Sequence, residues 1–130
     1  MYLIDTNIVI YLFKGRYDIP KKIAAKGKDN CFISEITLAE LKYGAEKSDK
    51  IEFHKNVIND FIKEIRILPI INVLDIYAKE KVRLEKSGMR LDEFDLLIGA
   101  TALANNFTLV TNNLNHFSRM ENIKIENWTN

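Results

Sequence analysis

The chain has 130 residues, of which 47% are hydrophobic and 28% are charged, a composition that excludes intrinsic disorder and suits one folded domain. Its formal net charge of +1 provides no general attraction for nucleic acid, so any basic surface has to be local. A single cysteine, Cys31, excludes an intramolecular disulfide and makes a reduced, cytoplasmic setting the natural expectation. The apolar N-terminus lacks the basic flank and cleavage site of a signal peptide, and no stretch reaches the roughly 20 apolar residues of a membrane span. We therefore expect no membrane partner.

The first half of the chain alternates short apolar runs with amphipathic segments. In chain order it predicts a strand at residues 2–4, helices at 7–13 and 19–26, a strand at 31–33, and helices from Ser34 to about 47 and at 51–65. Pro20 suits the first turn of its helix, and Ser34 is a preferred N-cap.

The second half continues the same alternation. It predicts a strand at 67–70, helices from Asn72 to about 87 and from Asp92 to 105, and strands at 108–110 and 123–126. Pro69 places the strand at 67–70 at a sheet edge or makes it end there. Short strands alternating with helices predict an α/β fold with four or five mostly parallel strands and helices on both faces.

Asp5 interrupts the most hydrophobic stretch of the chain, MYLIDTNIVIYLF, and has two interpretations. In the first, the chain turns after a strand and Asp5 or Asn7 caps the next helix. In the second, Asp5 is a site carboxylate, because functional sites of parallel sheets form at the carboxyl ends of strands. For this stretch alone, the capping interpretation is the simpler one.

Glu40 lies in the helix that follows Ser34. At about 100° per residue, Glu40 shares a narrow arc with Thr37 and Gly44, opposite the arc of solvated charges. Two apolar stripes separate the arcs; they consist of Ile36, Ala39 and Tyr43, and of Leu38, Leu41 and Ala45. The pattern indicates the rim of a cleft, and an ordinary solvated glutamate fits it equally well.

Asp92 and Asp95 begin a helix whose remainder, residues 96–104, carries no charge and should be buried. Asp92 as N-cap with Asp95 three residues later approximates a capping box. Alternatively this acidic helix end faces a ligand, since Asp92, Asp95 and Gly99 share one face.

Considered together, Asp5, Glu40 and Asp95 favour a metal site. Three carboxylates brought to one edge of a sheet repel one another unless a cation lies between them. Oxygen ligands without a Cys or His partner favour Mg²⁺ or Mn²⁺ over zinc. Metal-assisted phosphodiester cleavage is the reaction class that follows.

Four segments, LIDTNIVIYLFKG, ISEITLAELKYGAEKS, DLLIGATAL and LVTNNLNHFSRMENIKIENW, cover nearly the whole chain. In content and spacing they resemble the PIN-domain ribonucleases, and among these the VapC toxins of bacterial and archaeal toxin–antitoxin pairs. The resemblance implies a single PIN domain over residues 1–130. It also implies an α/β/α sandwich around a parallel sheet, with the acids gathered at one end.

By position, the resemblance assigns the catalytic acids to Asp5, Glu40 and Asp95. Asp5 and Asp95 are the implied direct ligands of Mg²⁺, with Mn²⁺ as the other candidate ion. Glu40 completes the cluster directly or through water. The implied supporting residues are Thr6, Asn7 and Thr111.

Many members of this family carry a fourth acid after the LVT strand, where this chain has Asn113 and His116. Asn113 can hydrogen-bond but adds no charge, and His116 is either a contact for an RNA phosphate or an ordinary surface histidine. We therefore expect one well-held ion and a second recruited by substrate. Asp92 stands where relatives often lack an acid, so it is either a cap or a local substitute.

The implied activity is Mg²⁺-dependent endoribonuclease cleavage of transfer or ribosomal RNA, which leaves 5′-phosphate and 3′-hydroxyl ends and inhibits translation. Basic residues that flank the motifs are candidates for contacts with RNA phosphates. They are Lys14, Arg16, Lys42, Lys47, Arg90 and Arg119.

The implied partners are a VapB-like antitoxin, whose C-terminal segment covers the acidic groove, and a second copy of the chain in a homodimer. Together they form a toxin–antitoxin hetero-oligomer that reaches operator DNA only through the antitoxin. Two other functions compete with this one. A catalytically silent PIN-fold interaction module conflicts with the intact acids, and a metal-dependent DNA nuclease needs more chain to grip a duplex.

Overall fold

The computed structural model describes residues 1–130 and has one five-stranded sheet in which every strand pair is parallel. The strand order is β3-β2-β1-β4-β5. The strands are β1 (Tyr2–Ile4), β2 (Cys31–Ser34), β3 (Arg66–Leu68), β4 (Thr108–Val110) and β5 (Lys124–Glu126). The predicted α/β fold with a parallel sheet is confirmed, and β3 lies at the sheet edge, as Pro69 indicated.

Seven helices connect the strands. They are α1 (Thr6–Phe13), α2 (Ile19–Lys26), α3 (Glu35–Lys47), α4 (Ile51–Glu64), α5 (Leu74–Lys86), α6 (Glu93–Asn105) and α7 (Leu114–Phe117). Six were predicted from the sequence, whereas α7 and two short 3₁₀ turns, Lys28–Asn30 and Ile71–Val73, were not. None of the helices has the length and apolar character needed to cross a membrane.

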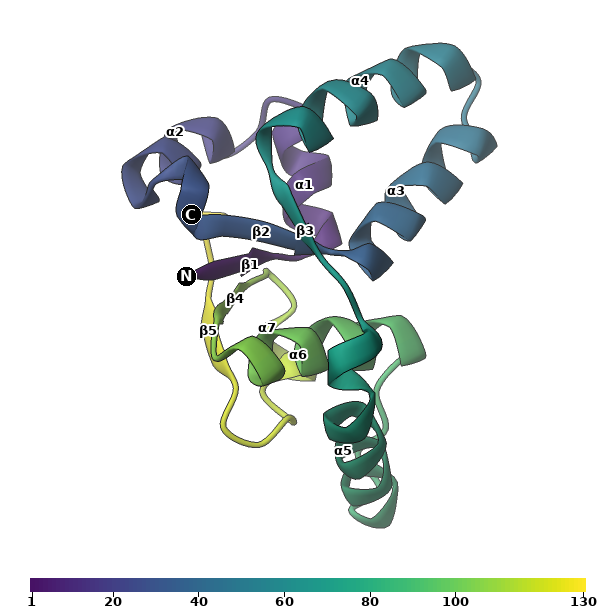
Figure 1. The fold of residues 1–130 in the computed structure, drawn as a ribbon, viewed down its shortest axis with the longest axis vertical. Coiled ribbons are helices and arrows are strands. Elements are labelled where there is room, and N and C mark those ends of the chain that lie inside the picture. The colour runs from purple at the N-terminus through teal and green to yellow at the C-terminus, as the bar shows by residue number, and fades with distance from the viewer.

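The alternation of strand side chains divides the interior into two cores. Ile4, Ile33 and Val110 point to one face, where they pack with side chains from α1 to α4. Their neighbours Leu3 and Leu109 point to the other face, which α5, α6 and α7 cover. Figure 1 shows the resulting three layers, with α1 to α4 on one side of the sheet and α5 to α7 on the other.

The stripe of α3 predicted from Ile36, Ala39 and Tyr43 is only partly an apolar contact face. Ile36 is buried, but Ala39 is exposed and Tyr43 is 66% exposed. The reason is that α3 touches the sheet only at its start and then extends away from it beside α4 (Figure 1). Farther along the helix, only the side facing α4 is buried, through Leu41 and Ala45.

The prediction that Asn72 caps the fifth long helix is wrong. α5 begins at Leu74, with Val73 as N-cap, after the 3₁₀ turn at Ile71–Val73. The chain is fixed here by other bonds: the Val73 N–H donates to the Ile70 carbonyl at 2.9 Å, and the Ile70 N–H donates to Glu35 Oε1 at 2.9 Å. Asn72 itself remains exposed.

The order of the strands reverses between β1 and β4. The chain moves outward from β1 to β2 and β3, then crosses to the other side of β1 to form β4 and β5. At such a switch point, the loops leaving the two central strands diverge to opposite sides and leave room for a site at the carboxyl edge. The residues that directly follow the two strands are Asp5 and Thr111.

Candidate active site

Asp5 is a buried carboxylate at the switch point, with only 4% of the residue exposed. Its backbone N–H donates to the Val110 carbonyl at 2.9 Å, which joins the end of β1 to β4. Its Oδ1 accepts from the Thr6 N–H at 2.8 Å and its Oδ2 accepts from the Thr111 hydroxyl at 2.8 Å. Asp5 is thus the N-cap of α1, as the simpler interpretation held, and one of its oxygens also bonds across the sheet edge.

Burial raises the pKa of Asp5 from its ordinary value of 3.8 to about 6. The hydrogen bonds from Thr111 and Thr6 oppose this rise, while the charges of Asp95 and Glu40 add to it. These charges act on one another because α3, which carries Glu40, packs against both α1 and α6. The three predicted acids therefore lie in one electrostatic neighbourhood.

Glu40 is half-buried and fixed in place by a hydroxyl. The Thr6 hydroxyl donates to Glu40 Oε1 at 2.7 Å and shares a 3.0 Å hydroxyl–hydroxyl hydrogen bond with the buried Thr37. This arrangement differs from that of a solvated surface glutamate. Thr37 was not assigned to the site from the sequence, although its position on the arc of Glu40 was the available signal.

Asp95 lies in the first turn of α6 and is half-buried. Burial raises its pKa, the nearby carboxylates of Asp92 and Glu40 raise it further, and the charge of His116 lowers it. Asp92 is exposed and caps α6, because its Oδ2 accepts from the Phe94 N–H at 3.2 Å. The capping interpretation of Asp92 is therefore confirmed.

Thr111, Asn113 and His116 continue the site on the β4 side. The Asn113 N–H donates to the Thr111 hydroxyl oxygen at 3.0 Å, and His116 Nδ1 lies 2.6 Å from Asn113 Oδ1. Asn7, by contrast, is exposed and its side chain forms no hydrogen bond with the acids.

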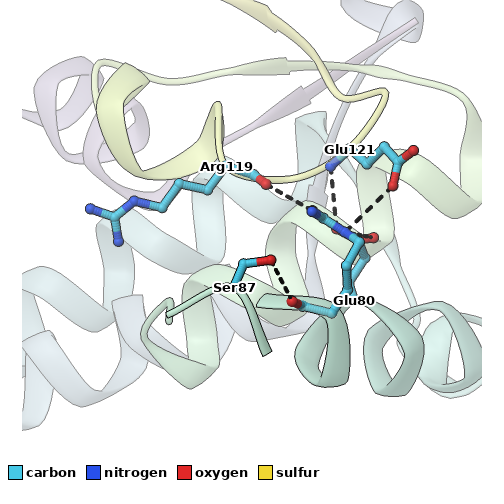
Figure 2. Close-up of polar contacts among 5 residues, drawn as sticks. Glu80, Ser87, Arg119 and Glu121 are labelled. Carbon is cyan, nitrogen blue, oxygen red and sulfur yellow. Dashed lines mark hydrogen bonds and ion pairs between the residues drawn. The ribbon is translucent and has the colours of Figure 1, made fainter. Parts of the chain in front are cut away.

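The turn that follows α7 is attached to α5 by Arg83. The Arg83 guanidinium donates to Glu80 through Nε at 3.0 Å and through Nη2 at 2.8 Å. The same Nη2 donates to the Arg119 carbonyl at 2.8 Å, and Nε lies 3.5 Å from Glu121 Oε2 (Figure 2). The Arg119 guanidinium in turn donates to the Arg90 carbonyl at 2.9 Å, ahead of α6. These bonds join the turn after α7 to α5 and to the segment that precedes α6.

The donor set suits a hard divalent cation. The protein's ion pairs all lie elsewhere, so no lysine or arginine compensates the charges of Asp5, Glu40 and Asp95. Repelling carboxylates with a buried, pKa-raised member are relieved by a cation, and oxygen ligands favour Mg²⁺ or Mn²⁺. No three acidic, His or Cys side chains converge as a group that could hold a metal ion by themselves, so water would have to complete the coordination shell of an ion bound here.

Comparison with known proteins identifies the family. The PIN domain model matches residues 2–123. The chain belongs to the PIN-domain family. Ribonuclease VapC2 of Rickettsia felis is 37% identical over 131 residues, which cover 98% of each chain. The tRNA(fMet)-specific endonuclease VapC of Salmonella typhimurium is 31% identical over 128 residues, covering 98% of this chain and 97% of its own.

Solved structures of VapBC complexes contain chains with the same fold as this protein. The crystal structure of VapBC2 from Rickettsia felis, bound to a DNA fragment from the promoter, has a chain that superposes with a TM-score of 0.92. The two chains are 35% identical, and the match covers 98% of each. The predicted α/β/α sandwich and the resemblance to VapC ribonucleases are thereby confirmed.

Proposed function

We infer that this chain is the endoribonuclease toxin of a VapBC-type pair and hydrolyses RNA phosphodiester bonds. The observation that carries the inference is the Asp5 carboxylate, which is buried, lacks a cationic partner and is aligned by Thr6 and Thr111 beside two further acids. Full-length relatives are named ribonuclease VapC and tRNA(fMet)-specific endonuclease VapC. The acidic site and the names of these relatives together support a ribonuclease activity.

Asp5 and Asp95 are the proposed ligands of a divalent ion, with Glu40 acting directly or through water. A divalent-metal requirement is general among PIN-domain nucleases, and the all-oxygen donor set supports Mg²⁺, with Mn²⁺ as the substitute. When bound, such an ion lowers the pKa of a water and neutralises charge that develops on the phosphate.

The protein's own residues give the site its orientation. The Thr6 N–H and the Thr111 hydroxyl each fix one oxygen of Asp5, so the carboxylate cannot rotate freely. The Thr6 hydroxyl holds Glu40 on the neighbouring helix in the same way. Preorganised acids of this kind need little rearrangement when the RNA phosphate arrives, and in-line attack by water leaves 5′-phosphate and 3′-hydroxyl ends.

The proposed substrate is transfer RNA or ribosomal RNA, and initiator tRNA is the first to test because a relative is named for it. Purified protein should cleave RNA in Mg²⁺, whereas folded Asp5→Asn and Asp95→Asn variants should not. If either variant cleaves RNA as fast as the wild type, the substituted aspartate is not an essential residue of the active site. Calorimetric Mg²⁺ titration separates a nuclease from a silent interaction module, and a duplex DNA substrate tests the DNA nuclease alternative. End-mapping of cellular RNA after brief expression identifies the cut.

A VapB-like antitoxin is the proposed partner, as in the complexes formed by structural relatives. We propose that its C-terminal segment occupies a groove of about 270 Å³ between α1, α3 and α4. Apolar side chains such as Ile10, Phe13 and the 59%-exposed Phe53 line this groove, and Glu40 forms part of its wall. An arginine of that segment then reaches the acids and blocks them by charge as well as by bulk.

Phe53→Asp tests the groove, because a charge would replace the apolar contact that Phe53 makes with the bound segment in the proposed complex. Antitoxin binding, measured by calorimetry with the purified partner, should weaken at least tenfold. Val82→Asp is the matched control, since Val82 is similarly exposed but lies on α5, on the opposite side of the sheet. If Phe53→Asp binds the antitoxin as tightly as the wild type does, the groove is not part of the interface.

The remaining proposed assembly is a homodimer within the toxin–antitoxin complex, which contacts operator DNA through the antitoxin. Ile71, Leu74 and Phe94 support a contact with a second copy, because they are exposed apolar side chains where α5 and its preceding turn meet α6. Light scattering on Ile71→Asp tests this contact. The variant should be monomeric, and a dimer as stable as that of the wild type would show that the contact involves another surface.

A further inference from the structure

A chain of hydrogen bonds leads from Asp5 to an exposed histidine. Thr111 donates to Asp5 at 2.8 Å and accepts from the Asn113 N–H at 3.0 Å. The Asn113 side chain then holds His116, with 2.6 Å between Oδ1 and Nδ1. Because a carboxamide oxygen only accepts, Nδ1 carries the hydrogen of this bond. The arrangement leaves Nε2 as the free nitrogen of an exposed imidazole.

The packing of α7 on α6 brings this imidazole to the acidic site. Gly99 lies one turn after Asp95, and the space a side chain would take there is filled by Met120 and Phe117. Phe117 directly follows His116 and is fully buried, so α7 cannot drift from α6. The result is that His116 lies close enough to Asp95 for its charge to lower the pKa of that carboxyl.

The charged groups around His116 are few. Asp92 and Asp95 lie at the start of α6, and Arg119 follows α7 with its guanidinium turned to the Arg90 carbonyl. The segment TNNLNHF, which runs from Thr111 to the end of α7, contains no carboxylate. On this side of the site the groups available to an RNA substrate are therefore amides and one imidazole, whereas the three proposed metal-binding acids lie at the end of β1, in α3 and in α6.

The proposed cleavage requires a proton donor for the leaving oxygen, and His116 lies on this side of the site. Formation of a 5′-phosphate requires the bond between phosphorus and O3′ to break. The departing O3′ then carries negative charge unless a proton reaches it during the step. A positioned imidazole is the commonest side chain for such a transfer, which typically contributes about 10²- to 10⁴-fold in rate.

We propose that His116 is the general acid of RNA cleavage, an inference that rests on the proposed ribonuclease function. In the reactive form the imidazole of His116 is protonated on both nitrogens. As the oxygen of water bonds to phosphorus and loses its proton to solvent, the P–O3′ bond breaks and this imidazolium gives its Nε2 proton to O3′. The products are a 5′-phosphate and a neutral 3′-hydroxyl, and the neutral imidazole regains a proton from solvent. Asn113 is the positioning residue, since its Oδ1 holds the hydrogen on Nδ1 and directs Nε2 outward.

A substrate with a better leaving group tests this role. One RNA oligonucleotide carries the natural scissile linkage, and a second carries sulfur in place of the bridging O3′, both with Mn²⁺. A thiolate leaves without being protonated. His116→Ala and His116→Gln should therefore cleave the oxygen substrate about 10²- to 10⁴-fold more slowly than wild type and the sulfur substrate within about tenfold of it. Both variants change an exposed side chain, so circular dichroism should confirm an unchanged fold.

The possible failures of this experiment are distinguishable. An equal loss on both substrates means that His116 binds or supports the RNA, which overturns the general-acid role. Wild-type rates for the variants on both substrates overturn it as well, while leaving the ribonuclease function in place. Wild-type protein that cleaves neither oligonucleotide overturns the ribonuclease assignment and the histidine role with it.

The positioning role of Asn113 can be tested without measuring activity, through the tautomer of the His116 imidazole. In metal-free protein, ¹⁵N signals of the His116 imidazole should report the Nδ1–H tautomer in the neutral form. Asn113→Leu should shift the tautomer toward Nε2–H and slow cleavage of the oxygen substrate alone. Asn115→Ala is the control, because Asn115 is exposed on the same helix and makes no side-chain hydrogen bond to His116. An unchanged tautomer in Asn113→Leu overturns the positioning role.

Discussion

Thr111 and Asp5 share a 2.8 Å hydrogen bond across the point where the strand order of the sheet reverses. The Thr111 oxygen also accepts from the Asn113 N–H, so its one hydroxyl hydrogen is committed to Asp5. The bond favours the ionised carboxylate and thereby opposes the burial that raises the pKa of Asp5 to about 6. A residue that precedes α7 thus tunes an acid that precedes α1.

Thr111→Val keeps the shape of the side chain and removes the donor. The pKa of Asp5 should rise further above about 6, because burial is unchanged and the carboxylate loses a hydrogen bond. Affinity for Mn²⁺ at pH 7 should fall about tenfold, as expected for one hydrogen bond to a charged group. Carboxyl ¹³C titration and calorimetry measure the two effects. Thr108→Val, at the other end of β4, should change neither; an unmoved Asp5 pKa contradicts the prediction.

Asp5→Asn should make the metal-free protein more stable at neutral pH while abolishing cleavage. The folded pKa of about 6 lies above the ordinary 3.8, so the folded state binds the proton more tightly than the unfolded chain. The wild-type free energy of unfolding should therefore fall as the pH rises from about 4 to 6, by at most about 3 kcal/mol from this group. Asparagine does not titrate and should escape that loss.

Urea unfolding in a chelator at pH 4 and pH 7 measures the difference between wild type and Asp5→Asn. The gap between the two proteins should be wider at pH 7, and excess Mg²⁺ should stabilise only the wild type. If the difference in the free energy of unfolding is the same at both pH values, the pKa of Asp5 is not raised in the folded protein.

Gly99→Ala should destabilise the contact between α6 and α7. The new Cβ would overlap Met120 Sδ in a place where both residues are buried, and the expected cost is about 1–3 kcal/mol. Gly44→Ala is the matched control, since Gly44 is also helical but has open space around its Cβ position. It should stabilise α3 by up to about 1 kcal/mol. Chemical denaturation distinguishes them, and equal effects would exclude the overlap as the cause.

Arg83→Ala should loosen the turn after α7, because Arg83 donates to the Arg119 carbonyl and lies beside Glu121 (Figure 2). We expect a loss of about 1–2 kcal/mol in the free energy of unfolding and faster hydrogen exchange at residues 119–122. Lys63→Ala removes an exposed ion pair with Asp60 and should leave exchange in that turn unchanged. Protection equal to wild type in Arg83→Ala contradicts the prediction.

Much of the fold was predictable because each element carries its own local signal. Ser34 accepts from the Thr37 N–H as the N-cap of α3, and Gly27 follows α2 with a positive φ of 94°. Pro69 likewise predicted that the third strand lies at a sheet edge or ends there, and β3 both lies at the edge and ends at Leu68. The start of α5 was misplaced because its anchor is Glu35, a residue of another helix that no local pattern connects to Ile70.

For the site, the sequence by itself determined which acids interrupt apolar segments, and it singled out Asp5, Glu40 and Asp95 through spacing and family resemblance. Only the tertiary structure decided how they are held. Thr6 bonds Glu40 across 34 residues, and Thr111 bonds Asp5 across 106. These contacts depend on the order of parallel strands and on the packing of α3 between α1 and α6. Burial, which raises the pKa of Asp5, likewise exists only once the sheet is covered on both faces.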